Sequence, residues 1–225
     1  MVNIEAVKEI LVRFGTIWVL WLLAGLSVVS VLLIIERLLL YRTAEGDLEG
    51  LARGLDQRLS SNDYEGALVF LRASPSVAAS IAAAGLRLAY LGPKSVHSAM
   101  LSATALEKSR LERWLAYLGT VGNNAPFVGL FGTVIGIIEA FEHLSEGTKA
   151  AAGQAASQAV MSSIAEALVT TAIGILVALP AVAFYNYLQR RVISLISGAE
   201  ALSNLLLAYL EEPNRSFPKV KGEIP

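Results

Sequence analysis

Three long stretches of the chain carry almost no charged side chains: residues 15–35, 114–138 and 150–188, the last interrupted only by Glu166. An α-helix needs about 20 consecutive apolar residues to cross the hydrocarbon core of a bilayer. The first two stretches match that length. The third is about twice as long, so we expect its Ala-, Gln- and Ser-rich start to lie outside the hydrocarbon. The pattern predicts three transmembrane helices, at residues 14–36, 114–139 and 160–188.

The segment between the first two transmembrane helices, residues 37–113, has the pattern of a helical loop. Apolar residues recur three to four positions apart at Leu48, Leu51, Leu55 and Leu59, which is the spacing of one helix face. Asn62 or Asp63 is placed to cap a following helix that runs through Leu71. We expect a third helix over residues 77–91, and a fourth that begins at Ser95 and continues without a break into the second transmembrane helix.

The remaining segments border these helices. Residues 1–13 have apolar side chains on one side, which predicts an amphipathic helix on the outer face of the membrane. Residues 140–159 are expected to form a short outer loop and the start of the third membrane helix. Apolar residues in residues 189–212 recur about every 3.5 positions, the spacing of a helix that packs against other helices. We therefore expect a cytoplasmic helix that extends the third membrane helix, and not a fourth membrane crossing. Residues 213–225 are expected to be a disordered tail.

The basic residues predict the orientation in the membrane. Cytoplasmic loops carry an excess of Lys and Arg close to the membrane. Five arginines border the predicted membrane helices on the side of residues 37–113 and of the C-terminus: Arg37, Arg42, Arg113, Arg190 and Arg191. The segment between the second and third membrane helices contains a single Lys or Arg, which is Lys149. We therefore expect a multi-pass membrane protein, with the C-terminus in the cytoplasm and the N-terminus and residues 140–159 on the outer side.

The composition narrows the class of protein. Of its 225 residues, 55% are hydrophobic and 16% are charged, and the net charge is −1. This balance argues against a soluble globular domain and against nucleic acid as a partner. The chain has no cysteine and two histidines, which excludes disulfides, a cysteine nucleophile and a multi-His metal site. We find no nucleophile–base set and no phosphate-binding loop, so we expect no enzyme activity, no cofactor and no metal.

Glu166 is the candidate for the chemistry. A charged residue inside a membrane helix costs about 2.5–3.5 kcal/mol on insertion scales, and such residues mark ion pathways. A carboxyl group that binds and releases a proton there is the minimal part of a proton path. The alternative is that Glu166 lies hydrated at the outer interface and has no role. Residues 139–146 include an acidic segment (Glu139, Glu142, His143 and Glu146) that either gathers cations or is a solvated helix end.

Small and hydroxylated residues accompany Glu166 on the second and third membrane helices. Stripes that permit close helix contact contain Gly129, Gly132, Gly136 and Gly174. We expect that three helices cannot satisfy all of these stripes, so that the chain assembles into a ring. Thr133, Thr170 and Thr171 are candidates to relay a proton or hold water, or else they bond their own backbone carbonyls. Pro126 and Pro180 predict kinks in the two helices.

Two runs carry a resemblance to a known family. NNAPFVGLFGTVIGIIEAF (residues 123–141) and SIAEALVTTAIGILVALPAVAFYNYL (residues 163–188) resemble the two signature helices of the ExbB/TolQ/MotA proton-channel family, and are most similar to the ExbB/TolQ branch. The resemblance implies that Glu166 matches the family glutamate, and that Thr133 and Thr171 match two family threonines. Thr170 stands where relatives often have a small apolar residue.

The same resemblance implies an architecture and a function. We expect an all-α integral membrane protein with three transmembrane helices and long cytoplasmic helical extensions. It would form a homopentameric ring around a dimer of a single-span ExbD/TolR-like partner, in contact with membrane lipid. The resemblance implies a motor subunit of the bacterial inner membrane, with its N-terminus in the periplasm. Its proton channel would power transport, envelope maintenance or gliding. The work would be passed on by a TonB/TolA-like or gliding-machinery effector. The alternatives are a non-conducting membrane scaffold and a sodium-driven stator.

Overall fold

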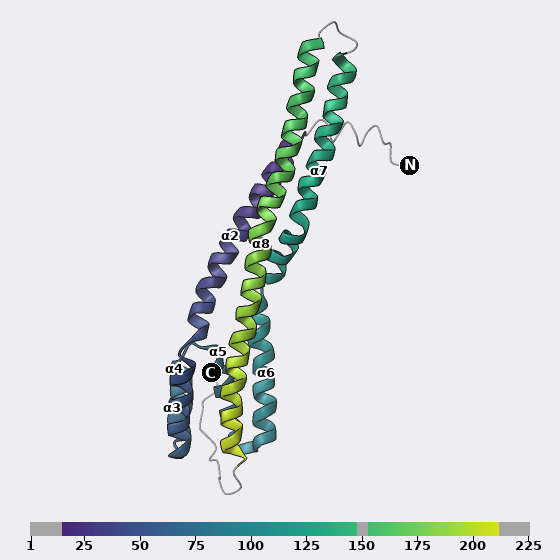
Figure 1. Cartoon of the computed structure of the whole chain (residues 1–225). Helices are drawn as coiled ribbons and strands as arrows, with labels where there is room; N and C mark the ends of the chain where they lie inside the picture. Colours follow the sequence, from purple (N-terminus) through teal and green to yellow (C-terminus); the bar gives the residue numbers. More distant parts are fainter. Residues whose placement is uncertain (1–14, 148–152, 212–225) are drawn as a thin grey trace, which may run out of the picture. The chain divides into compact units, whose positions relative to one another are not determined.

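The computed structural model describes residues 15–147 and 153–211, and within these the chain forms helices and no strand (Figure 1). The all-α prediction is thus confirmed for the described residues. The α-helices are α2 (Ile17–Glu45), α3 (Leu48–Ser60), α4 (Tyr64–Ala73), α5 (Val77–Leu86), α6 (Pro93–Glu112), α7 (Leu115–Gly147) and α8 (Gly153–Leu210), with a short 3-10 helix at Ala89–Leu91. Of these, α2, α7 and α8 contain segments long and apolar enough to cross a membrane, as predicted.

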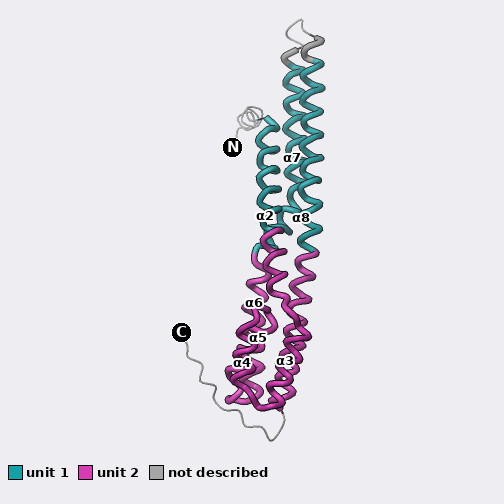
Figure 2. Tube along the Cα trace, turned by 90° about the vertical axis from the view of Figure 1, so that its left-hand side faces the viewer, with its two compact units in different colours: residues 1–34, 114–186 teal, residues 35–113, 187–225 magenta. Residues whose placement is uncertain are grey.

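The chain divides into two compact units, drawn in teal and magenta in Figure 2. Unit 1 consists of Met1–Ile34 and Trp114–Asn186, and unit 2 of Ile35–Arg113 and Tyr187–Pro225. The uncharged stretches of the sequence fall mainly in unit 1, while the helical loop predicted between the first two membrane helices forms most of unit 2.

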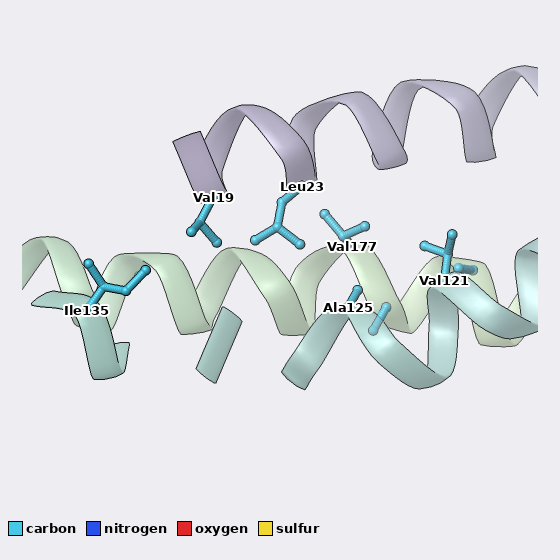
Figure 3. Close-up of a cluster of buried hydrophobic side chains, with 8 residues drawn as sticks. Val19, Leu23, Val121, Ala125, Ile135 and Val177 are labelled. Atoms are coloured by element: carbon cyan, nitrogen blue, oxygen red, sulfur yellow. The ribbon is translucent and has the colours of Figure 1, made fainter. Parts of the chain in front are cut away.

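Unit 1 is held together by a core to which all three apolar helices contribute (Figure 3). Val19 and Leu23, one turn apart on α2, are both fully buried. They belong to one cluster with Ala125 and Ile135 of α7 and Val177 of α8. Side chains four residues apart lie on the same face of a helix, so α2 offers this face to the core, while Ile17 and Trp21 are exposed.

The small helices of unit 2 begin where the sequence predicts. Leu51, Leu55 and Leu59 form the buried face of α3, which confirms the leucine spacing. Asp63 is the N-cap of α4 and its carboxylate accepts a hydrogen bond from the Gly66 N–H, so Asp63 and not Asn62 caps this helix. The helix ends at Ala73, two residues later than expected, because the following Ser74–Pro75 segment is extended.

The helix predicted over residues 77–91 is shorter than expected. It ends at Leu86, and a single 3-10 turn follows before the chain reverses at Gly92, whose φ is +92°. The reversal lays α6 along α5, and a Cβ on Gly85 would lie 2.5 Å from Cγ of Met100. The prediction was wrong because packing of α6 against α5 competes with further elongation of α5.

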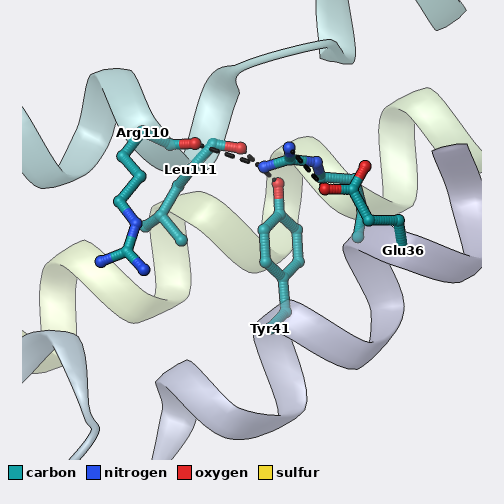
Figure 4. A network of polar contacts seen from close by, with 5 residues as sticks. Glu36, Tyr41, Arg110 and Leu111 are labelled. Carbon is teal, nitrogen blue, oxygen red and sulfur yellow. Dashed lines mark hydrogen bonds and ion pairs between the residues drawn. The ribbon is translucent and has the colours of Figure 1, made fainter.

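The helix predicted to run from Ser95 into the second membrane helix is broken. It starts at Pro93 and ends at Glu112, and Trp114 has a left-handed backbone with φ +68°. Two buried side chains of α2 supply donors to the last turn of α6 (Figure 4). Nη1 of Arg37 donates to the Arg110 carbonyl oxygen at 3.3 Å, and the hydroxyl of Tyr41 donates to the Leu111 carbonyl oxygen at 2.8 Å.

These two hydrogen bonds explain why the break is tolerated. The last carbonyl groups of an α-helix have no intrahelical donor and need other partners when they are buried. Burial raises the pKa of Tyr41 to about 12, so its hydroxyl stays protonated and keeps its hydrogen for the Leu111 carbonyl. The side chains of Arg37 and Tyr41 therefore act as a C-terminal cap for α6 in place of continued helix.

The two long helices α7 and α8 extend further than the predicted membrane segments. Helix α7 continues to Gly147 and α8 starts at Gly153, so most of the loop expected at residues 140–159 is helical. Helix α8 runs without interruption for 58 residues, so residues 189–210 continue the helix of the third apolar stretch. Their place in the cytoplasm stays a prediction. The predicted surface helix at residues 1–13 and the predicted tail at residues 213–225 lie outside the described residues.

Candidate functional site

The site is built on the close contact of α7 with α8 in unit 1. A Cβ on Gly174 would lie 2.7 Å from the Ala125 carbonyl oxygen and 2.9 Å from Cα of Gly129. The reciprocal Cβ on Gly129 would lie 3.0 Å from the Thr170 carbonyl oxygen. Contacts this short with backbone atoms mean that the two helices touch backbone to backbone, which only glycine permits here.

The other two glycines of α7 extend this contact. A Cβ on Gly132 would lie 2.3 Å from Cγ2 of Thr170, and one on Gly136 would lie 2.6 Å from Cβ of Ala167. The small-residue stripes therefore meet one another within a single chain. Packing of α7 against α8 within one chain accommodates these four glycines, so they do not by themselves require a ring. Assembly into a ring stays a prediction.

The predicted threonines separate into two groups. Thr171 and Thr133 lie together across the α7–α8 contact: Oγ1 of Thr171 is 3.4 Å from Oγ1 of Thr133 and 3.0 Å from the Gly129 carbonyl oxygen, to which it donates. The Thr133 hydroxyl donates to the Leu130 carbonyl oxygen at 2.6 Å. Thr170 instead is fully buried against Gly132 and donates to the Glu166 carbonyl oxygen of its own helix.

Glu166 lies at the edge of this contact, on an exposed part of the α8 surface. Its Oε2 accepts a hydrogen bond from Oγ1 of Thr16, at 3.4 Å. Thr16 immediately precedes α2 and is itself buried, with 1% of its surface exposed. A single chain thus leaves the carboxyl group of Glu166 open on one side and holds it on the other through the start of α2.

A second carboxyl group lies near the same place. Gly15 has a φ of +58°, and a Cβ on it would lie 2.9 Å from Oε1 of Glu139 on α7. The charges of Glu166, His143 and Glu142 all act on the Glu139 carboxyl group. Gly15 therefore lies next to Glu139, and the following residue, Thr16, bonds to Glu166.

Sequence reasoning placed Glu139 in an acidic segment that either gathers cations or is a solvated helix end, and it did not find Thr16. The one available signal for Thr16 was that it is a polar residue at the very start of an uncharged stretch. Its partner Glu166 is 150 residues away, and no local pattern links the two.

Two prolines lie within the helices that form the site. Pro126 and Pro180 lie inside α7 and α8, which continue past them, and the kinks stay a prediction. Within residues 15–147 and 153–211, no three acidic or histidine side chains are grouped so as to hold a metal ion. The arrangement instead offers an exposed carboxyl group, a second carboxyl group near it, and a pair of hydroxyl groups on the adjoining helix contact.

The family model of the MotA/TolQ/ExbB proton channel family matches residues 73–201, which is more than half of the chain. The chain belongs to this family. The match includes α6, α7 and most of α8, and thus every predicted site residue. It also confirms the resemblance that the two signature runs indicate.

Curated relatives carry the names of both branches. The Tol-Pal system protein TolQ of Pseudomonas aeruginosa is 45% identical over 98 residues, which is 44% of this chain and 40% of that protein. TolQ of Haemophilus influenzae is 46% identical over 99 residues, or 44% of this chain and 41% of that protein. The biopolymer transport protein ExbB of Xanthomonas campestris pv. campestris (strain B100) is 41% identical over 95 residues, or 42% of this chain and 36% of that protein. The chain therefore aligns with less than half the length of each relative.

Proposed function

We propose that this chain is the inner-membrane subunit of a motor driven by the proton-motive force. With an ExbD/TolR-like single-span partner it would form a proton channel in which Glu166 carries the proton. Thr133 and Thr171 would line the same path. The observation that carries the proposal is the placement of Glu166: its carboxyl group is exposed on the chain and, within the described residues, its one hydrogen bond comes from the Thr16 hydroxyl.

An exposed carboxyl group on a membrane helix calls for a further partner. Leaving a charged side chain in hydrocarbon costs about 2.5–3.5 kcal/mol on insertion scales. Glu166 would therefore face other chains or a water-filled path, and not lipid. Both would be supplied by a pore formed between copies of the chain and their partner.

The exposed apolar surface supports assembly of several copies. Large side chains of α7 and α8 stand open on the single chain, among them Phe127 and Phe141 (both 67% exposed), Leu168 (63%) and Leu176 (68%). Such surface is stable against lipid or against another apolar helix face. We propose a homopentamer in which α7 and α8 line the centre, α2 lies outside, and two copies of the partner occupy the pore.

The proposed membrane boundaries follow the charges. The spans would be residues 14–36, 114–139 and 160–188, with residues 37–113 and the C-terminal part of α8 in the cytoplasm. Because cysteine is absent, single-Cys variants test this cleanly. A Cys at Ser145 should react with an impermeant thiol reagent from the periplasmic side and a Cys at Ser60 should not. The reverse pattern would overturn the orientation.

The work powered by the motor would be done at the outer membrane. Relatives named for the Tol-Pal system and for biopolymer transport suggest envelope maintenance or transport through a TolA- or TonB-like effector, and gliding is a further candidate.

Proton flux in liposomes tests the proposal. The chain would be reconstituted with its partner, and flux would be measured for the wild type and for Glu166→Gln, which keeps the size of the side chain but cannot release a proton. We expect the variant to assemble normally and to lose flux. Assembly without flux in the wild type would favour a scaffold, and flux that requires sodium would favour a sodium-driven stator.

A further inference from the structure

A cavity of about 260 Å³ opens in unit 2 between the end of α2 and the C-terminal part of α8. It lies where both helices change from apolar to basic sequence. The uncharged stretch of α2 ends at Ile35, and α8 has no charged residue between Glu166 and Arg190. In a membrane protein this transition marks the level at which helices leave the hydrocarbon and enter the head-group region.

The lining of the cavity has two chemically distinct parts. Ile35, Leu38 and Leu39 of α2 form an apolar wall, and Ile35 and Leu39 are 50% and 59% exposed. The other part is polar and basic, with Arg42 of α2 and Arg191 of α8. Tyr187, which is 48% exposed, adds an aromatic ring with a polar tip, the kind of side chain that is enriched at membrane interfaces.

The charges around the cavity leave an excess of positive charge. Arg191 forms an ion pair with Glu45 through Nη2 and Oε2. Arg42 has no carboxylate partner among the described residues. Glu36, the other acidic residue nearby on α2, is already paired with the buried Arg37 at 3.2 Å. One guanidinium group at the cavity is therefore unneutralised, and a second is only partly neutralised by an exposed carboxylate.

We propose that this cavity binds the head group of an anionic phospholipid. The phosphate would lie between Arg42 and Arg191, and an acyl chain would follow the apolar wall formed by Ile35 and Leu39. Basic pockets between membrane helices on the cytoplasmic side are suited to such head groups. A single guanidinium group can donate two parallel hydrogen bonds to two oxygens of one phosphate. A free phosphate ion would use the arginines but would gain nothing from the apolar wall, so the combination of the two favours a lipid.

The test is a lipid titration of the intact chain. The full-length protein, purified in detergent, is titrated with phosphatidylglycerol or with phosphatidylcholine of the same acyl chains, and bound lipid is counted by native mass spectrometry. We expect phosphatidylglycerol to bind more tightly. Arg42→Gln and Arg191→Gln should each weaken it about five-fold, the effect of one basic residue near an anionic lipid, and should leave phosphatidylcholine unchanged.

Arg190 provides the matched control. It is exposed, it is the neighbour of Arg191 in the sequence, and it is not among the residues that line the cavity. Arg190→Gln removes the same charge at the same depth, so it should leave the affinity for phosphatidylglycerol within about two-fold, since a screened charge away from the head group contributes little. Glu45→Gln should act in the opposite direction and strengthen binding, because it releases Arg191 from its ion pair.

Three results would overturn the proposal. Equal binding of the two lipids would show that the cavity does not select an anionic head group. Equal losses in Arg190→Gln and Arg191→Gln would assign the preference to the general charge of the surface. Full displacement of phosphatidylglycerol by millimolar inorganic phosphate would show a phosphate site without a lipid component. Melting temperatures of the variants, measured in the same detergent, verify that each remains folded.

Discussion

Thr16, which directly precedes α2, donates a hydrogen bond to the carboxylate of Glu166 in the N-terminal quarter of α8, across 150 residues of sequence. The contact ties the beginning of the first apolar helix to Glu166, the one charged residue of the sequence stretch 150–188. It also leaves the other side of the carboxyl group uncovered. Glu166 is thus positioned within the chain before any partner is present.

This contact predicts a specific coupling between the two residues. Thr16→Val keeps the shape of the side chain but removes the donor, and we expect it to lower the stability of the purified chain by about 0.5–1.5 kcal/mol, the usual value of one hydrogen bond. Thr16→Ser should retain most of the stability because it keeps a hydroxyl group. In a Glu166→Ala background, Thr16→Val should have no further effect. Equal effects of Thr16→Val in both backgrounds would show that the two side chains do not interact.

The backbone contact between α7 and α8 makes a second prediction. Gly174→Ala places a methyl group 2.7 Å from the Ala125 carbonyl oxygen, so the helices must separate. Overpacking of this kind costs about 1–3 kcal/mol, and the apparent melting temperature in detergent should fall. Gly25 of α2 is the matched control, because no atom lies within 4 Å of a Cβ there. Gly25→Ala should leave the melting temperature unchanged or raise it; an equal fall in both variants would argue against the close contact.

The cap of α6 makes a third prediction. Tyr41→Phe removes the donor to the buried Leu111 carbonyl and leaves that oxygen without its partner. The expected loss is about 1–3 kcal/mol in the free energy of unfolding. Tyr187→Phe makes the same chemical change at an exposed position and should have little effect. A Tyr41→Phe variant as stable as the wild type would mean that the break between α6 and α7 does not depend on this bond.

These residues also show how far the sequence alone could predict the structure. The leucine spacing predicted α3, the adjacent Asn62 and Asp63 predicted the start of α4, and two signature runs predicted the family. Each of these signals is local. The break after Glu112 was missed because its cap comes from Arg37 and Tyr41, some 70 residues earlier. The pairing of the glycine stripes was missed for the same reason, since periodicity shows which face of a helix is small but not which surface it meets.

The last prediction concerns Glu139, which the turn at Gly15 and Thr16 brings to the neighbourhood of Glu166. The charge of Glu166 acts on the Glu139 carboxyl group, so the two groups lie near enough for Glu139 to be a step on the proton path to Glu166. Glu139→Gln removes one member of the pair, and Glu142→Gln removes a carboxylate three residues further along α7. In liposomes that contain the partner, we expect Glu139→Gln to reduce proton flux about ten-fold, the effect on a transfer step of losing about 1.5 kcal/mol of interaction with a charged group.

Glu142→Gln should reduce the flux by less than about two-fold, because the half-buried Glu142 acts on the Glu139 carboxyl group more weakly than Glu166 does, and solvent and salt screen part of its charge. The assembly of both variants with the partner, followed by size-exclusion chromatography, separates an effect on flux from an effect on folding. If Glu139→Gln assembles and conducts as well as Glu142→Gln, the carboxyl group of Glu139 has no part in the path. Glu166 would then receive its proton directly from water, through the side that the single chain leaves open.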